Sequence, residues 1–557
     1  MDNLEILAKF EIRNSKFEIS ELEKILLKNR GLTAKKAIEE FLSPDIKKIS
    51  TKSLGINQKA VDRSLKRIKQ AIDKKEQIII YGDYDVDGIT ASAILWETLR
   101  DAGASVMPYI PHRVTHGYGL SEKGVEDMLK DYSAAKVVIT VDNGIVADKG
   151  VEFANKKGLD VIVTDHHLPS KKLPKAFSII HTTKVCGAGV AYMFAQEIRN
   201  EFKLKKNNNH LELVALATVA DLMPLMGPNR AFLKKGLEVL HKTERIGLLE
   251  IFQEAQIEKE KIGTYEIGHI IAPRLNAMGR LEHAMDSLRL LCTPNKKRAK
   301  ELAQKLGLTN KDRQKLTFDT LIHAKEALNG KVMKKLIVLS NETYEEGIIG
   351  LVAGRLTEEF YRPAIVISKG KLISKASARS VKGFNIIEFI RQAESFLINA
   401  GGHPGAAGFS FETKNLPLLQ KKLEDLAEKV LDEKILLKRI RVDLELDLSL
   451  INAKLYGVLK KFEPFGMANP QPTFLAKGVL IESTRVVGYD GKHLKLLLRF
   501  DEKPNDIISA IAFGMADRIE SLKRGNRVNI VYTIEENIWN DRVSYELKIK
   551  NLGKKDD

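Results

Sequence analysis

The 557-residue sequence has little of the material that defines several large classes of protein. It holds two cysteines, Cys186 and Cys292, which are too few for a disulfide framework or a zinc ribbon. No apolar run approaches the roughly 18–20 residues that span a bilayer, and the opening residues lack the apolar segment of a signal peptide. There is no internal repeat and no low-complexity tract. Together these absences favour an ordinary globular protein of the reducing cytoplasm.

Acidic residues are fewer than basic ones, with 73 Asp and Glu against 90 Lys and Arg. The formal net charge is +17, and no basic tail produces it, because every region of the chain carries an excess of cations. A polyanion that runs over several domains would favour this distribution. General solubility explains the charge equally well, so the charge alone does not decide between the two.

The length is too great for one hydrophobic core and predicts three or four domains. Helical patterns separate four short apolar strands, which are expected at 78–81, 106–110, 137–141 and 161–164. Strands that alternate with helices predict an α/β fold with a parallel sheet and helices on both faces. We expect a small helical segment at 1–54 and assign this first α/β domain to residues 55–210.

The remainder of the chain divides by pattern into three further parts. Residues 211–330 are mostly helical and end in a long connector helix, with a break expected around Gly307. A second α/β domain is expected at 331–435, with strands at 336–340, at 364–368 and from Leu372 onward. After a charged helix ending near Arg441, residues 441–557 change to a run of short strands, which indicates a small β-barrel.

Acidic side chains follow the predicted strands of the first sheet, at the edge where open parallel sheets bind ligands. The first strand runs into Gly-Asp-Tyr-Asp-Val-Asp-Gly, and later strands end in Val-Asp-Asn-Gly and Thr-Asp-His-His. If the chain after the first strand is extended, its three acids at a spacing of two project to one side. The residues concerned are Asp83, Asp85, Asp87, Asp142, Asp165, His166 and His167.

Any one of these acids could simply cap the N-terminus of a helix. As a group on one sheet edge, however, five acids would repel one another and raise each other's pKa. Carboxylate oxygens with an imidazole suit a divalent ion such as Mn²⁺, and two ions could share a bridging carboxylate. Asp221 adds another acid near the end of an almost wholly apolar helix, where a metal ligand is favoured over a cap or a salt bridge.

Four segments resemble, in order, the motifs of the DHH phosphoesterase family. They are GDYDVDG at 82–88, VDNG at 141–144, DHH at 165–167 and ATVAD at 217–221. Later segments narrow the resemblance to the single-stranded-DNA exonucleases of that family. They are PRLNAMGR at 273–280, EGIIGLVA at 346–353, SARS at 377–380, GGHPGAAG at 401–408, PFGMANPQPTF at 464–474 and GKHLKL at 491–496.

The resemblance covers roughly residues 55–550, with two departures. Tyr344-Glu345 stands where many relatives have Trp-His, and Ala376 stands where they have glycine before the Ser-Ala-Arg-Ser segment. Neither departure touches the acidic set, so we expect the chemistry to be unchanged.

The resemblance implies a parallel-sheet DHH domain, a helical connector, a DHH-associated α/β domain and an oligonucleotide-binding (OB) barrel. The implied activity is the release of mononucleotides from single-stranded DNA, in the 5′ to 3′ direction, during DNA repair and recombination. Hydrolysis would use two Mn²⁺ or Mg²⁺ ions. Single-stranded DNA is therefore the expected partner, with a single-strand-binding protein and a helicase as further candidates. The expected state is a monomer.

The resemblance also implies roles for the acidic and histidine residues. The implied metal ligands are Asp85 for one ion, Asp87, His166 and Asp221 for the other, and Asp142 as the bridge. Asp83 would act through a water molecule. Asp165 would orient a histidine, and His167 would face the scissile phosphate or the leaving oxygen.

Substrate binding is implied for Arg113, Asn276, Arg280, Ser377, Arg379, Gly402 and His403. Arg379 with the Ser377 hydroxyl would clamp a phosphate, Gly402 would allow close approach of the backbone, and His403 would donate a hydrogen bond. Two plainer interpretations stay open, in which Arg379 is a solvated surface residue and Gly401-Gly402 is a tight turn.

Two other functions remain open on the sequence. A relative that cleaves short oligoribonucleotides or dinucleotides would lack the barrel at 441–557. A non-catalytic DNA-binding member would have lost the acidic motifs, which are intact in this chain.

Overall fold

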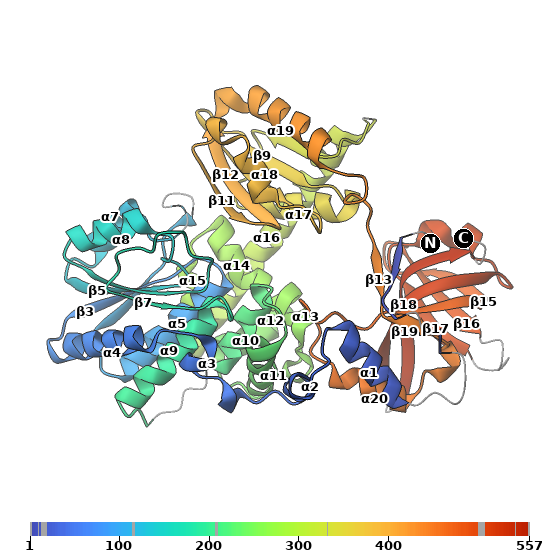
Figure 1. The fold of residues 1–557 in the computed structure, drawn as a ribbon, viewed down its shortest axis with the longest axis horizontal. Coiled ribbons are helices and arrows are strands. Elements are labelled where there is room, and N and C mark those ends of the chain that lie inside the picture. Colours follow the sequence, from blue (N-terminus) through green and yellow to red (C-terminus); the bar gives the residue numbers. More distant parts are fainter. Residues whose placement is uncertain are drawn as a thin grey trace. The chain divides into compact units, whose positions relative to one another are not determined.

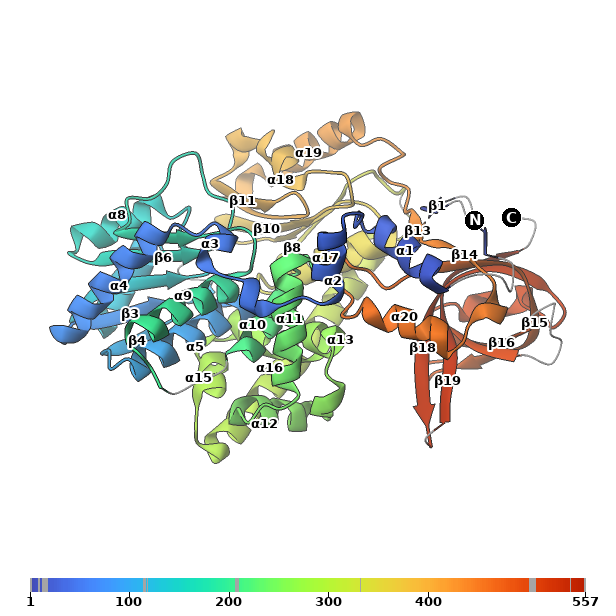
Figure 2. The same cartoon turned by 60° about the horizontal axis from the view of Figure 1, so that its bottom comes forward.

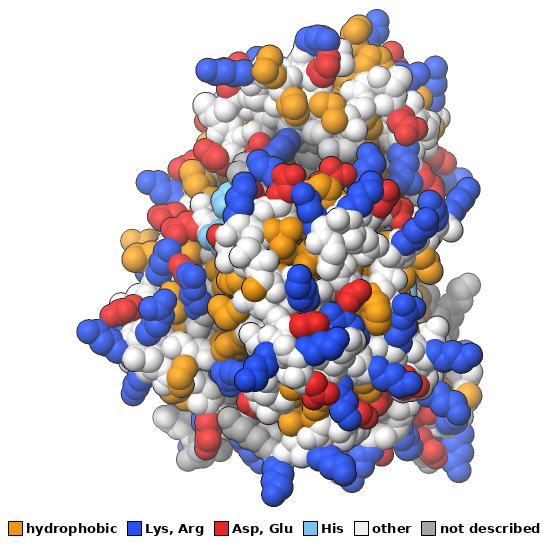
Figure 3. All heavy atoms as spheres, turned by 90° about the vertical axis from the view of Figure 1, so that its left-hand side faces the viewer, with side chains coloured by type: hydrophobic (Ala, Val, Ile, Leu, Met, Phe, Trp, Pro, Cys, Tyr) orange, Lys and Arg blue, Asp and Glu red, His pale blue; other side chains and the backbone are white. Residues whose placement is uncertain are grey.

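The computed structural model describes residues 3–8, 11–12, 19–113, 117, 119–205, 210–330, 332–499, 507–540 and 542–554. It divides into two compact units. The larger consists of Asp45–Met223 and Pro228–Leu437, and the smaller of Met1–Pro44, Pro224–Gly227 and Lys438–Asp557. Among the described residues, none of the helices combines the length and the apolar character that a membrane span requires. On the face drawn in Figure 3, Lys and Arg side chains are scattered among Asp and Glu rather than gathered in one patch.

The larger unit begins with a five-stranded parallel sheet, which confirms the α/β fold predicted for this region. Its strands lie in the order β4(Val106–Tyr109), β3(Gln77–Tyr81), β5(Ala135–Val141), β6(Asp160–Asp165) and β7(Ser178–His181). The four predicted strands are present, and β7 is an additional one at an edge.

Helices cover both faces of this sheet because alternate strand residues are apolar on both sides. Ile78 and Ile80 pack into one core with α4(Gln58–Asp73), α5(Val86–Asp101) and α9(Gly187–Glu201). Ile79 and Tyr81 pack into another with α7(Glu122–Asp131) and α8(Asp148–Lys156). Figure 1 shows the two helical layers on opposite sides of the sheet. The loops at its carboxyl edge are thereby held between two packed cores.

A helical region follows, as predicted. Its helices are α10(Leu211–Ala220), α11(Gly227–Leu240), α12(Ile246–Ala255), α14(Ala272–Leu281), α15(Met285–Cys292) and the 33-residue connector α16(Lys296–Leu328). The expected break in the connector is wrong, because α16 continues through Gly307. A Cβ atom on Gly307 would lie 2.2 Å from Oε1 of Glu254, so the glycine permits close packing against α12 rather than ending the helix.

The second α/β domain is a mixed five-stranded sheet. Its order is β11(Asn399–His403), β12(Ala406–Glu412), β10(Ile373–Arg379), β9(Ala364–Ser368) and β8(Ile337–Asn341), with only the β8–β9 pair parallel. The strands predicted at 336–340, at 364–368 and from Leu372 are confirmed. The helices are α17(Ile349–Phe360), α18(Ile386–Arg391) and α19(Leu416–Val430). The charged helix predicted to end near Arg441 ends earlier, at Val430, and residues 440–442 form a strand.

The smaller unit contains the predicted barrel. Its sheet runs β16(His493–Arg499), β17(Ile507–Ala512), β19(Arg542–Lys554), β18(Arg527–Trp539), β15(Phe474–Val487), β14(Leu444–Leu446) and β2(Glu11–Ile12). A further pairing of β15 with β16 closes it. β18 and β19 form a long hairpin (Figure 2).

Residues 1–44 belong to the barrel unit, and the segment expected to be helical at 1–54 contains two short strands in addition to its helices. β1(Leu4–Ile6) pairs in parallel with β13(Ile440–Val442), and β2 pairs with β14. The helix α1(Ile19–Asn29) buries Leu22 and Leu26 in the same core as α20(Ala453–Lys461). Short strands at the start of the chain carry little periodic signal of their own, and here their pairing protects a strand edge that would otherwise be open.

Candidate metal centre

Acids from four segments of the larger unit meet at the carboxyl edge of the parallel sheet. Asp83 follows β3, Asp142 follows β5, Asp165 ends β6 and is followed by His166 and His167, and Asp221 follows α10. The chain after β3 is not extended through all three acids, because α5 begins at Val86. Asp85 is therefore the N-cap of α5, and Asp87 lies in its first turn.

Asp85 caps α5 with one carboxylate oxygen, which leaves the other oxygen available for a metal ion. Its Oδ1 accepts hydrogen bonds from the N–H groups of Asp87 at 3.0 Å and Gly88 at 3.2 Å. The N–H of Val86 is satisfied separately, by Oδ1 of Asn276 at 2.9 Å. Capping and metal binding are thus compatible at Asp85, since one carboxylate oxygen performs the first and the other is free for the second.

Asp142 belongs to two clusters of potential ligands at once. One cluster is Asp83, Asp85 and Asp142, and another is Asp142, His166 and His167, each with ligand atoms within 4.8 Å of one another. Asp142 is 2 % exposed and has a φ of 61°, in the left-handed region that aspartate tolerates better than most residues. This backbone conformation turns the side chain between the two groups.

His166 lies among three carboxylates. Its Nε2 atom is 3.1 Å from Oδ1 of Asp142, 3.6 Å from Oδ2 of Asp87 and 3.7 Å from Oδ2 of Asp221. This Nε2 is buried and has no hydrogen-bond partner among the described residues. Burial lowers the pKa of His166, which favours the neutral imidazole that metals bind. Asp87, His166 and Asp221 form a further cluster of potential ligands.

Asp87 is held by the N-terminus of α9. Its Oδ2 accepts from the N–H of Gly187 and its Oδ1 from the N–H of Ala188, each at 2.6 Å. Free N–H groups and the helix dipole favour negative charge at this position. The carboxylate is thereby fixed in place with lone pairs left on both oxygens.

Asp165 orients His167 rather than His166. Its Oδ1 lies 2.8 Å from Nδ1 of His167 and accepts from the backbone N–H groups of His166 and His167. Its Oδ2 accepts from the N–H of Ile145 at 2.9 Å. Burial alone would lower the pKa of His167, but the hydrogen bond and charge of Asp165 outweigh it and raise the pKa to about 9. The raised pKa favours the protonated form of His167, and its Nε2 lies on the side of the ring away from Asp165.

Several acids of the centre have raised pKa values because they are buried close to one another. Burial, followed by repulsion from neighbouring carboxylates, raises the pKa of Asp83 and of Asp142 well above the usual range. The same causes raise the pKa of Asp221 to about 8. Divalent cations would relieve this repulsion, and oxygen ligands with one neutral imidazole fit Mn²⁺ or Mg²⁺.

Four of the expected substrate-binding residues lie together on the second sheet. Strand register places Arg379 and His403 on either side of Ala406, and Ser377 across from Gly408. Nη1 of Arg379 donates to Oγ of Ser377 at 3.1 Å, and His403 is exposed. The residues between them on β12, Ala406, Ala407 and Gly408, are all small.

Gly402 lies in β11 and not in a tight turn. Its φ is 143°, and a Cβ atom there would be 2.4 Å from the carbonyl oxygen of Ala406. Any side chain would therefore force β11 away from β12. The structure contradicts the tight-turn interpretation of Gly401-Gly402.

Arg113 and Arg280 belong to a group of arginines within the larger unit. Arg113 lies over the ring of Tyr84 at 4.8 Å, and Nη1 of Arg280 donates to the carbonyl oxygen of Gly347 at 3.1 Å. Burial, and then the charges of Arg113, Arg313 and Arg379, lower the pKa of Arg280 to about 9. A group of arginines of this kind favours the binding of a polyanion.

Some contributors to the site escaped the sequence reasoning. Arg313 on α16 had no distinguishing signal among the many cations of that helix. Gly187 did have a sequence signal. Gly-Ala-Gly at the start of an apolar helix is typical of a helix N-terminus that a carboxylate or phosphate approaches closely. Asn276, expected on the nucleic-acid path, contacts the acidic loop through Val86.

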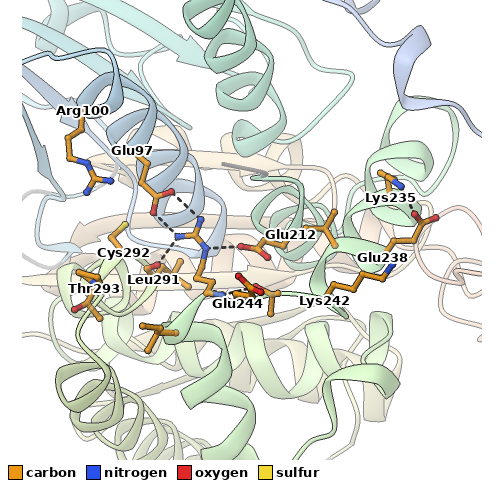
Figure 4. A pocket seen from close by; sticks show the side chains of 15 residues that line it. Glu97, Arg100, Glu212, Lys235, Glu238, Lys242, Glu244, Leu291, Cys292 and Thr293 are labelled. Atoms are coloured by element: carbon orange, nitrogen blue, oxygen red, sulfur yellow. Dashed lines mark hydrogen bonds and ion pairs between the residues drawn. The ribbon is translucent and has the colours of Figure 1, made fainter. Parts of the chain in front are cut away.

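A separate cavity of about 670 Å³ opens at the other ends of α5 and α10. Its wall contains Glu97 and Glu212, which converge on the guanidinium of Arg245 (Figure 4). Arg245 donates to Glu97 at 2.7 Å and to Glu212 at 2.8 Å, and His210 lies 2.9 Å from Glu97. This network ties together the ends of the two helices that lie away from the acids.

Comparison with known proteins gives consistent matches along the chain. Family models match the DHH family N-terminal domain at residues 77–218, the DHHA1 domain at 333–429 and the RecJ OB domain at 442–551. The single-stranded-DNA-specific exonuclease RecJ of Bacillus subtilis is 34% identical over 507 residues, 89% of this chain and 63% of that protein. The chain thus spans less than two thirds of that relative's length.

The match to a second relative covers a larger share of that relative's length. RecJ of Thermus thermophilus is 31% identical over 494 residues, 87% of this chain and 70% of that protein. The crystal structure of Thermus thermophilus RecJ in complex with Mn²⁺ superposes with a TM-score of 0.81 at 29% identity, covering 96% of this chain and 76% of that one.

Proposed function

Because this chain belongs to the RecJ family, we propose that it is a metal-dependent exonuclease that hydrolyses single-stranded DNA. One observation carries the proposal. Asp142 is shared by two clusters of potential ligands, which is the arrangement required of a carboxylate that bridges two ions. The direction of digestion, 5′ to 3′, and the release of mononucleotides belong to the same proposal.

We assign two Mn²⁺ or Mg²⁺ ions to the centre. Asp85 and Asp142, with Asp83 directly or through water, would hold one ion. Asp87, His166 and Asp221 would hold the other, with Asp142 shared. Bound there, the ions would supply hydroxide from water near neutral pH and neutralise charge on the attacking and leaving oxygens.

The chain's own residues position the substrate. Protonated His167, fixed by Asp165, can donate to a phosphate oxygen or to the leaving oxygen. Arg379 and Ser377, with His403 across Ala406, would hold the terminal phosphate. The arginines at 113, 280 and 313 would extend the positive charge beyond this phosphate, along the bound DNA strand.

The barrel supports a single strand as the substrate. OB barrels bind single strands by combining basic grooves with aromatic stacking. An enzyme of this kind depends on other factors for access to single strands, so a single-strand-binding protein and a helicase are the partners we propose. We further propose a monomer that acts in the cytoplasm.

Digestion of end-labelled DNA with Mn²⁺ tests the function. A single strand labelled at its 5′ end should release labelled mononucleotide at once, a 3′-labelled one should release label only late, and a chelator should stop both. A blunt duplex of the same sequence should resist. Cleavage confined to dinucleotides or short oligoribonucleotides would replace this function with the related one, and binding without cleavage would make the chain a DNA-binding protein.

A further inference from the structure

Asp221 differs from the other acids of the centre in the chain that follows it. α10 ends at Ala220, and Leu222 has a φ of 54°, in the left-handed region, although its side chain is 64 % exposed. The N–H of Met223 then donates to the carbonyl oxygen of Thr218 at 3.0 Å. The two residues after Asp221 thus close the helix end and set its backbone.

The next residues belong to the smaller unit, which contains the barrel. The segment Pro224–Gly227 is part of that unit, and the N–H of Leu225 donates to the carbonyl oxygen of Met467 at 2.8 Å. The side chain of Leu225 is 2 % exposed. A Cβ atom on Gly466 would lie 2.6 Å from Cδ1 of Leu225, so the two residues are in close contact.

The loop that receives Leu225 is itself firmly held. Asn469 is fully buried, and its Nδ2 donates to the carbonyl oxygens of Phe462 at 2.8 Å and Pro464 at 2.9 Å. Its Oδ1 accepts from Nε of Arg30 at 2.7 Å. Because every polar atom of this side chain is used within the smaller unit, the loop can act as a fixed anchor for Leu225.

We propose that the segment from Asp221 to Gly227 ties the position of the Asp221 carboxylate to the barrel unit. Four residue steps separate Asp221 from Leu225, a span of at most about 14 Å. The side chain of Asp221 is 31% exposed, against 2% and 3% for Asp87 and Asp142. Packing therefore holds Asp221 less than those two, and the chain on its carboxyl side decides more of its position.

This coupling rests on the proposed metal centre and adds a property to it. The affinity of the centre for its second ion depends on how the barrel unit holds Leu225. Coupling between two sites is reciprocal. A change in the barrel unit therefore alters ion binding at Asp221, and ion binding alters the barrel unit by the same free energy.

Calorimetric titration of the full chain with Mn²⁺ tests the coupling without reference to activity. Leu225→Ala removes the anchored side chain, and Gly466→Ala adds one methyl group where Leu225 now packs. Both should weaken Mn²⁺ binding by about fivefold or more, the lower end of typical couplings between sites. Hydrogen exchange at the Met223 amide, measured without metal, should become faster in both variants.

Leu498→Ala is the matched control, because Leu498 is a fully buried leucine of the barrel on β16 and not on the anchor loop. Its affinity for Mn²⁺ should stay near that of the wild type. Wild-type affinity in both anchor variants, or an equal loss in Leu498→Ala, would overturn the coupling. Should Leu225→Ala not fold, Gly466→Ala decides alone. A wild-type chain that binds no Mn²⁺ would instead overturn the metal centre.

Discussion

Gly187 and Asp142 are in such close contact that a Cβ atom on the glycine would lie 2.7 Å from both Cβ and Oδ1 of the aspartate. The N–H of Gly187 also donates to Asp87 at 2.6 Å. One residue at the start of α9 therefore fixes the distance between the proposed bridging acid and a ligand of the second ion. A side chain at position 187 would push Asp142 away while the backbone still held Asp87.

Gly187→Ala should lower both Mn²⁺ affinity and hydrolysis by at least about tenfold, a change of roughly 1.4 kcal/mol. The physical reason is displacement of Asp142 by overpacking, since the glycine has no left-handed φ to lose. Gly457→Ala, in helix α20 with no atom near the added methyl group, is the control and should be neutral or slightly stabilising. Undiminished Mn²⁺ binding in Gly187→Ala would show that Asp142 is not a ligand.

Asp142→Asn should abolish hydrolysis and yet stabilise the metal-free protein. Asparagine tolerates the left-handed φ of 61°, and it removes one of the buried charges that repel each other. Thermal unfolding should show a higher melting temperature without metal and a smaller upward shift on adding Mn²⁺ than in the wild type. Asp142→Ala should also be inactive, and more than about a tenth of wild-type activity in either variant would contradict the two-ion assignment.

Arg379→Lys tests the phosphate clamp. Lysine keeps the charge but cannot form two parallel hydrogen bonds from a planar group, so turnover on a 5′-phosphorylated single strand should fall severely. DNA affinity should fall less, because other cations share the binding, and stability should barely change. Arg391→Lys, at an exposed position in α18, is the control. Near-normal kinetics in Arg379→Lys would leave Arg280 and His403 as the remaining clamp candidates.

A chain of residues 45–437 should still cleave short single strands at saturating Mn²⁺ but should bind long strands less well and lose processivity. Removal of the barrel alone would be uninformative, since it would expose Leu22 and Leu26 of α1, which are now fully buried. The removal therefore has to include residues 1–44. Digestion of a long strand in the presence of competitor DNA measures processivity, and an unchanged value would assign the barrel another purpose.

The network around Glu97 should make stability depend on pH in the acidic range. Burial opposes ionisation of Glu97, but His210 and Arg245 outweigh it and hold the pKa at about 2. In the unfolded chain the pKa is about 4.3, so the network stabilises the fold above that pH and the contribution is lost as pH falls toward 2. Between pH 5 and pH 2, Glu97→Gln should reduce the loss of unfolding free energy by on the order of 3 kcal/mol. Glu152→Gln, on an exposed ion pair that solvent screens, should change the pH profile far less.

The strands and the acidic set were predictable because each left a local signal. Ile78–Tyr81 is an apolar run followed at once by the three acids, and parallel strands bring such ends to one edge. The barrel was marked by a run of short strand-like segments between residues 441 and 557. In both cases the information for each strand lies within about ten residues.

What was not predictable depends on contacts between distant residues. Gly307 was expected to mark a helix break, but it lies inside α16 where that helix packs closely against Glu254. That the chain after β3 enters α5 at Val86 depends on Asn276, which accepts from the N–H of Val86, as well as on the capping by Asp85. That Asp165 orients His167 and not His166 could be decided only from the positions of both imidazole rings.

The parallel pairing of Leu4 with Ile440 has a consequence for synthesis of the chain. On the ribosome the first strand emerges long before its partner, and at about 5–20 residues per second the interval is roughly 20–90 s. During that time the residues of β1 and α1, including Leu22 and Leu26, have no permanent place to pack. The larger unit can fold meanwhile, so we expect the N-terminal segment to be a site where chaperones bind the nascent protein, and the barrel to be the last part to form.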